Sequence, residues 1–152
     1  MTLIEALIAL GISAVVLSAL GAAIYTILNT TGRGNDEITT IRDIQSASYW
    51  ISDDAQMARQ VTFFGGAPTS NMTLLWNDSE GNPHFSNYFV SGTELIRNCD
   101  SIQTTVAWNV SAVEFSATND ILTYSIASSI PGRWNVNQRT TGQVYLRAYA
   151  GE

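Results

Sequence analysis

The side chains that most often perform catalysis are few in this sequence and stand apart from one another. Among 152 residues there is one histidine, His84, and one cysteine, Cys99. A general-base histidine needs an orienting partner and a nucleophile, and a nucleophilic cysteine needs a base beside it. His84 follows a proline at a turn, so we expect a surface or packing role for it, and a buried structural role for Cys99. The sequence also lacks a nucleophile elbow, a phosphate loop and a haem-attachment motif, and it predicts a protein that is not an enzyme.

Two groups of acidic residues could form a catalytic pair or a metal site. Asp53 and Asp54 are adjacent in a helical pattern and therefore point about 100° apart, which predicts a solvated helix face rather than a paired-acid site. The segment 78–82 offers several oxygen ligands, to which Asp100 and Asp120 could add, and calcium favours such loops. The spacing does not match an EF-hand, so we expect a plain polar turn and leave a bound calcium ion open. A single cysteine excludes an internal disulfide and a cysteine-pair metal site, and we expect no cofactor.

One carboxylate has an unusual setting. Glu5 lies near the front of an apolar stretch, and residues 6–32 carry no charge at all. About 20 apolar residues in a helix span the hydrocarbon core of a bilayer. The sequence therefore predicts a membrane helix over residues 1–30. An acid within such a helix is costly unless it is paired, and by default it marks a function. Its obvious partner is an α-amino group, if the chain begins at Met1.

The charge composition limits the partners of the chain. Its formal net charge is −6, and its basic residues are seven scattered arginines. A nucleic-acid surface needs clustered lysine and arginine, so we expect no nucleic-acid binding by this subunit alone. The length suits one globular unit besides the apolar segment. The flank before Glu5 has no basic residue, which is unusual for a signal anchor. We expect either that a charged flank has been removed by processing or that the protein orients in the membrane by other means.

Two glycines follow the apolar segment. Gly32 and Gly34 each weaken a helix by roughly 1 kcal/mol, so residues 31–35 predict a hinge, a local unwinding or a true break. A helical pattern resumes at residue 36, with Asp36 and Glu37 in its first turn and Arg59 in its last. Its apolar stripe comprises Ile38, Ile41, Ile44, Ile51, Ala55 and Ala58, and the stop is expected at Gly65–Pro68.

Beyond this stop the hydrophobic period changes to two. Alternating residues separated by turn clusters predict antiparallel strands with one buried face, which the preceding amphipathic helix would cover. We therefore expect an α+β fold in which residues 36–152 form a globular head. The predicted strands are 72–76, 85–90, 94–97, 110–115, 121–126 and 143–149, with a long loop at 131–137.

The residues Met1-Thr2-Leu3-Ile4-Glu5-Ala6-Leu7-Ile8-Ala9-Leu10 resemble the mature N-terminus of type IV pilin-like proteins. In that family a glutamate stands fifth in an uncharged helix, which continues into an αβ head. The segments 42–55, 88–98, 110–115 and 144–147 resemble parts of the heads of J-type minor pseudopilins and W-type minor pilins. The departures are Met1 in place of the usual phenylalanine and the absence of a helix-bending proline, whose role would pass to Gly11, Gly21, Gly32 and Gly34.

The resemblance implies the pilin fold and a structural subunit of an extracellular filament. A prepilin peptidase would remove a leader, and the new terminus at Met1 would be methylated. The helix would sit in the inner membrane and then be moved by the assembly machinery into a filament of identical copies at the cell surface. Glu5 would there neutralise the Met1 amine of a neighbouring subunit.

Other classes of function stay open. The chain would also suit a minor pseudopilin at the tip of a type II secretion system, or a monomeric binding module anchored in the membrane. A membrane-tethered enzyme with unrecognised acids in the head is a third alternative. The sequence does not separate adhesion, motility, DNA uptake and secretion.

Overall fold

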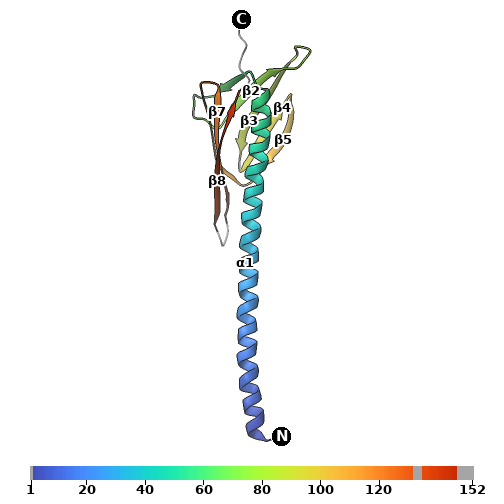
Figure 1. Ribbon diagram of the computed structural model, residues 1–152, viewed down its shortest axis with the longest axis vertical. Coiled ribbons are helices and arrows are strands. Elements are labelled where there is room, and N and C mark those ends of the chain that lie inside the picture. Colours follow the sequence, from blue (N-terminus) through green and yellow to red (C-terminus); the bar gives the residue numbers. More distant parts are fainter. Residues whose placement is uncertain (1, 132–134, 147–152) are drawn as a thin grey trace. The chain divides into compact units, whose positions relative to one another are not determined.

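The computed structural model contains one long helix followed by antiparallel strands (Figure 1). It describes residues 2–131 and 135–146, and the statements below concern these residues. Contacts divide the chain into two units, one ending at Asp36 and the other beginning at Glu37. Helix α1 is Leu3–Met57, and the strands are β1 Gln60–Phe63, β2 Met72–Asn77, β3 Pro83–Ser91, β4 Glu94–Cys99, β5 Ile102–Ala107, β6 Val110–Thr118, β7 Ile121–Ile130 and β8 Val136–Tyr145.

The α+β class is therefore confirmed. Helix α1 differs from the expectation at residues 31–35 and at the residue where it ends. The segment 31–35 is helical, so the predicted unwinding or break is wrong, whereas a hinge within a continuous helix stays a prediction. Extending an existing helix adds one hydrogen bond per residue, which offsets the cost of two glycines. Asp36 and Glu37 consequently lie inside a helix and not at its start.

The helix ends earlier than Gly65–Pro68, because the chain is captured by a sheet. The amide of Ala58 still bonds to the carbonyl oxygen of Asp54, but the amide of Arg59 donates to the carbonyl oxygen of Leu75 at 2.9 Å. This bond places the following residues beside β2 as strand β1. Arg59 is thus outside the helix, contrary to the prediction.

The strands form two sheets and not one. The first has the order β1-β2-β3-β4-β5 and the second the order β6-β7-β8, and every pairing between neighbours is antiparallel. Two edge strands, β1 and β5, were not predicted. The last strand was misplaced, since β8 begins at Val136 within the predicted loop and ends at Tyr145. Residues 132–134 of that loop and residues 147–149 of the predicted strand lie outside the described residues.

Short turns fix the register of these hairpins. Asp100 and Ser101 connect β4 to β5 with φ angles of 48° and 74°, and Asn119 and Asp120 connect β6 to β7 with 50° and 61°. Two successive positive φ angles are typical of the type I′ turn, whose twist matches that of the flanking strands. Each turn therefore sets which residues of its two strands face the core.

One face of α1 beyond residue 37 packs on the core of the head. Ile44, Ala47, Ile51 and Ala55 are buried there against residues of both sheets, including Tyr88 and Phe115. Part of the predicted stripe is therefore confirmed. Ile38 and Ile41 are exposed, at 58% and 43%, and lie outside this core.

The second sheet is tied to the helix by a close approach at Gly142. The ring of Tyr124 on β7 lies over Gly142 on β8, where a Cβ atom would come within 2.2 Å of the ring. The hydroxyl group of Tyr124 lies 3.3 Å from that of Ser52 on α1. A glycine at this position thus lets the aromatic ring reach the helix.

A buried ion pair joins α1 to the first sheet. The carboxylate of Asp54 is completely buried and accepts two bonds of 2.7 Å from the guanidinium group of Arg97 on β4. The hydroxyl group of Tyr88 on β3 donates a third bond of 2.6 Å to it. Arg97 also lies over the ring of Trp50, 4.7 Å from its centroid. The prediction of a solvated face is therefore wrong for Asp54 but correct for Asp53, which is exposed.

Electrostatics inside this group keep Arg97 charged and Tyr88 protonated. Hydrogen bonding to Asp54 raises the pKa of Arg97, and burial together with the charge of Asp54 raises the pKa of Tyr88. Arg97 and Tyr88 therefore both donate to a carboxylate that has no access to water. An ion pair of this kind is tolerated when its hydrogen bonds are complete, and losing one partner leaves the other charge uncompensated.

We predict that Asp54→Asn lowers the unfolding free energy by about 3–5 kcal/mol, because it leaves the Arg97 charge without a counterion. Urea unfolding of the full chain in a non-ionic detergent, followed by tryptophan fluorescence, measures this change. The neighbouring exposed variant Asp53→Asn is the control and should stay within about 0.5 kcal/mol of the wild type. Equal stabilities of the two variants would contradict the assigned role of the pair.

Candidate functional site

The first candidate site is the apolar part of α1. Residues 2–28 are all exposed in the single chain, and an 18-residue window of this helix has a mean hydropathy of 2.4. Within the described residues, α1 is long and apolar enough to cross a membrane, a property that N-terminal signal sequences share. The predicted transmembrane character is thus compatible with the structure.

Four hydroxyl groups on this part of α1 bond to the backbone of the helix itself. The hydroxyl groups of Ser13, Ser18, Thr26 and Thr30 each donate to a backbone carbonyl oxygen three or four residues earlier, at 2.8 to 2.9 Å. A serine or threonine satisfied in this way needs no partner from outside the helix. The outer surface of the segment is consequently apolar almost throughout, as burial in lipid or among other helices requires.

Glu5 has a specific contact at the start of the helix. One of its carboxylate oxygens, Oε2, accepts a bond of 2.8 Å from the amide of Thr2, whose carbonyl oxygen in turn accepts from the amide of Glu5. A threonine followed three residues later by a glutamate is the capping-box pattern, which satisfies amides left free at a helix N-terminus. This role was not predicted, although the Thr-x-x-Glu spacing signals it. Met1, the predicted partner, lies outside the described residues.

The four glycines proposed for flexibility are all in helical backbone. At Gly11, Gly21 and Gly34 a Cβ atom would meet nothing within 4 Å in the single chain. Their small size is therefore not required by packing within the chain itself. Their role in bending stays a prediction.

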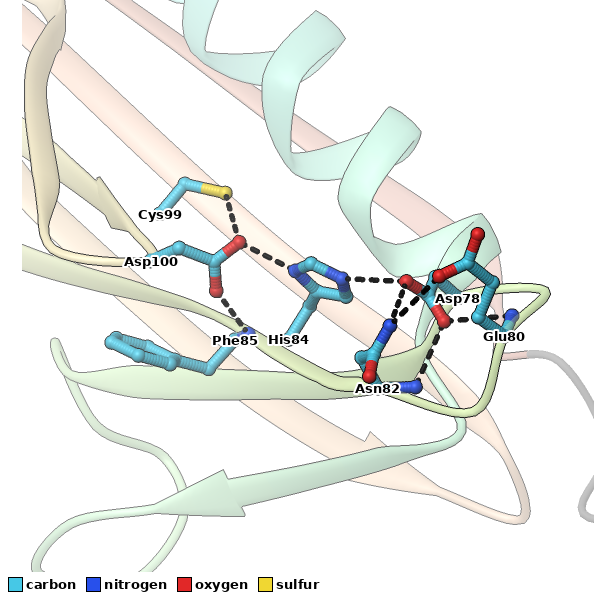
Figure 2. Close-up of polar contacts among 7 residues, drawn as sticks. All are labelled: Asp78, Glu80, Asn82, His84, Phe85, Cys99 and Asp100. Carbon is cyan, nitrogen blue, oxygen red and sulfur yellow. Dashed lines mark hydrogen bonds and ion pairs between the residues drawn. The ribbon is translucent and has the colours of Figure 1, made fainter.

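The second candidate site is a cluster around His84 at one end of the first sheet (Figure 2). Its ring nitrogen Nδ1 lies 2.6 Å from Oδ2 of Asp100, and Nε2 lies 3.4 Å from Oδ2 of Asp78. The ring stacks on Trp76 of β2, with centroids 6.0 Å apart. His84 is half-buried, as expected for a surface residue, but its link to two acids was not predicted. The signal in the sequence is the pair Asp100-Ser101 between two strands, which marks a tight turn.

Each acid of this cluster is fixed by further bonds. Asp78 accepts from the amides of Glu80 and Asn82 and from the side chain of Asn82, all at 2.8 to 2.9 Å. Asp100 accepts from the amide of Phe85 at 3.0 Å. The bonds from Asn82, with those from His84 and Glu80, lower the pKa of Asp78 to about 2, and the bond from His84 lowers the pKa of Asp100.

The side chains of this cluster do not form the calcium site that the sequence left open. Asp78 and Asp100 face opposite nitrogens of one imidazole ring, so they do not converge on a common point. Among residues 2–131 and 135–146, no group of three histidine, cysteine, aspartate or glutamate side chains could hold a metal ion. The segment 78–82 is a turn closed by its own hydrogen bonds.

Cys99 does not form a nucleophile with His84. Its thiol lies 4.0 Å from Oδ2 of Asp100, so its hydrogen-bond partner is a carboxylate and not the imidazole ring of His84. The residue is half-buried rather than buried, contrary to the expectation. A catalytic cysteine is activated by an imidazole or by a positive charge beside it. The cluster therefore lacks the arrangement of a catalytic cysteine.

No family model, curated protein or solved structure matches the chain.

We predict that Asp78 makes the head sensitive to acid. Because its pKa is lowered from 3.8 to about 2 in the folded chain, it contributes stability that is present above pH 4 and is lost as the pH falls through about 2. Urea midpoints between pH 5 and pH 2 should therefore fall more steeply for the wild type than for Asp78→Asn. Parallel curves for the two proteins would contradict the assignment.

Proposed function

We propose that this protein is a structural subunit of a type IV pilus-like extracellular filament and that it polymerises through the apolar part of α1. The observation that carries the proposal is a fully exposed, uncharged helix surface with a single acid near its start. Such a surface needs a cover, which a membrane supplies first and copies of the same helix supply afterwards. The resemblance of residues 1–10 to pilin-like proteins supports the same function.

In the proposed filament, Glu5 exchanges its bond with the Thr2 amide for a charged partner. The α-amino group of Met1 of a neighbouring subunit approaches the carboxylate, after a prepilin peptidase has removed a leader and the terminus has been methylated. An unpaired charge in an apolar core costs several kcal/mol, whereas a matched and hydrogen-bonded pair is tolerated. Subunits added in a wrong axial position leave both charges unpaired, so the pair also selects the register.

The experiment must separate the cap of the helix from the pairing between subunits. Glutamine fills the same capping-box position as glutamate but carries no charge. Glu5→Gln therefore keeps the bond to the Thr2 amide and removes the attraction to a neighbouring ammonium group. Glu5→Ala removes both.

We predict that Glu5→Gln and Glu5→Ala both block filament formation while the head stays folded. Electron microscopy of sheared surface material measures the filaments, near-ultraviolet circular dichroism reports the head, and mass spectrometry identifies the N-terminal peptide. Ser13→Ala, an exposed change on the same helix, is the control and should assemble normally.

Filaments of Glu5→Gln at the wild-type yield would contradict the proposal. An acetylated Met1, or a leader still attached in working filaments, would do the same. A wild-type chain that is extracted only as a monomer would favour an anchored binding module. Filaments that contain the protein only at their tips would favour a minor pseudopilin.

A further inference from the structure

His84 connects two turns that are separated in the sequence. Asp78 opens the turn 78–82 between β2 and β3, and Asp100 opens the turn between β4 and β5. Both turns lie at the same end of the first sheet, with the imidazole ring between their carboxylates (Figure 2). The side chains of the three residues are each about one third exposed, so protons can reach the ring.

The number of protons on the ring decides how many of these contacts are attractive. A neutral imidazole has one N–H group and one lone pair, whereas an ionised carboxylate only accepts. Because the contact from Nδ1 to Asp100 is the shorter of the two, we expect the neutral ring to keep its proton on Nδ1. In the neutral ring the lone pair of Nε2 then faces Oδ2 of Asp78, and two acceptors oppose each other. Both contacts are attractive only when the ring is an imidazolium ion.

We propose that His84 is a proton-operated latch, which holds the turn 78–82 to the β4–β5 turn when the ring is charged and releases it when the ring is neutral. This inference does not rest on the filament function. Hydrogen bonds to Asp100 and then to Asp78 raise the pKa of His84, which places the change at or above the ordinary value of about 6.5. Three further titratable side chains lie near the two acids in the described part of the chain. They are the carboxylate of Glu80, the guanidinium group of Arg97 and the thiol of Cys99.

The released turn keeps its own structure. The bonds from Glu80 and Asn82 to the Asp78 carboxylate lie within the turn and do not involve the ring. Asp100 likewise keeps its bonds with Phe85, through both the amide and the carbonyl oxygen of that residue. Loss of the proton therefore moves the turn 78–82 as a unit and leaves the β4–β5 turn in place.

The latch can be tested on the full chain in non-ionic micelles by NMR. Because His84 is the one histidine of the sequence, labelled histidine gives one ring signal. We expect a midpoint above 6.5 and, above that midpoint, a neutral ring protonated at Nδ1, which is the reverse of the tautomer that free histidine prefers. The amide signals of residues 79–82 should follow the same midpoint, and their heteronuclear NOE values should fall as the turn gains mobility.

Asp78→Asn is the matched control. An asparagine amide can donate to a neutral Nε2, and its carbonyl oxygen can accept from a protonated one, so this contact should persist at both pH values. The midpoint should then drop below that of the wild type, and the turn should no longer respond to pH. A ring protonated at Nε2 in the wild type, or turn amides that ignore the titration of the ring, would overturn the proposal without any variant.

Discussion

A helix that is apolar on all sides has to be covered, and this constraint governs the whole chain. Burying a leucine, isoleucine or valine side chain stabilises by about 1.5–3 kcal/mol, and residues 3–28 hold many of them, none of which is buried in the single chain. The hydroxyl groups of Ser13, Ser18 and Thr26 in this segment donate to carbonyl oxygens of the helix itself. A bilayer or other copies of the helix would both provide a largely apolar cover. In the proposed filament, specificity would then come from the single charge, Glu5.

The same helix changes character once it enters the head. From Thr40 onward its buried residues lie on one face, as in any amphipathic helix that packs on a core. What distinguishes this helix is the carboxylate of Asp54. Apolar packing alone tolerates small rotations and shifts, whereas three hydrogen bonds from Arg97 and Tyr88 to one buried carboxylate do not. The ion pair thus fixes which face of α1 meets the first sheet, at the cost of a buried charge.

The sequence predicted the elements that carry a regular pattern. These elements are the apolar segment, the helical stripe around Ile44 and Ile51, and the alternating strands β2, β3, β4, β6 and β7. Their buried residues recur with a regular spacing along the sequence, so they could be located. The edge strand β5 was missed, since its exposed half reads Ile-Gln-Thr and lacks alternation. The strand β8 was misplaced because most of its residues are exposed polar groups and Gly142 resembles a break.

Long-range pairs were beyond the reach of local patterns. Asp54 looks like Asp53 until Arg97, 43 residues later, is brought over it. His84 likewise meets Asp100 only after β3 and β4 have paired. In both cases the sequence shows that the side chain can carry a charge. Whether that side chain is exposed to water depends on which residues the paired strands bring next to it. The sequence could therefore place Glu5 within the apolar helix, because that setting is local, but not the partners of Asp54 and His84.

Charge is sorted along this chain in a way that fits association of its helices. Of the net charge of −6, Glu5 contributes −1, so the remainder of the chain carries −5. Acidic heads repel one another, but this repulsion is screened beyond about 8–10 Å at ordinary ionic strength. Apolar contact and a buried ion pair act at shorter range and are not screened in this way. In the proposed filament, charge repulsion between the heads is therefore weak beyond this distance, and the contacts of Glu5 would decide how the copies align.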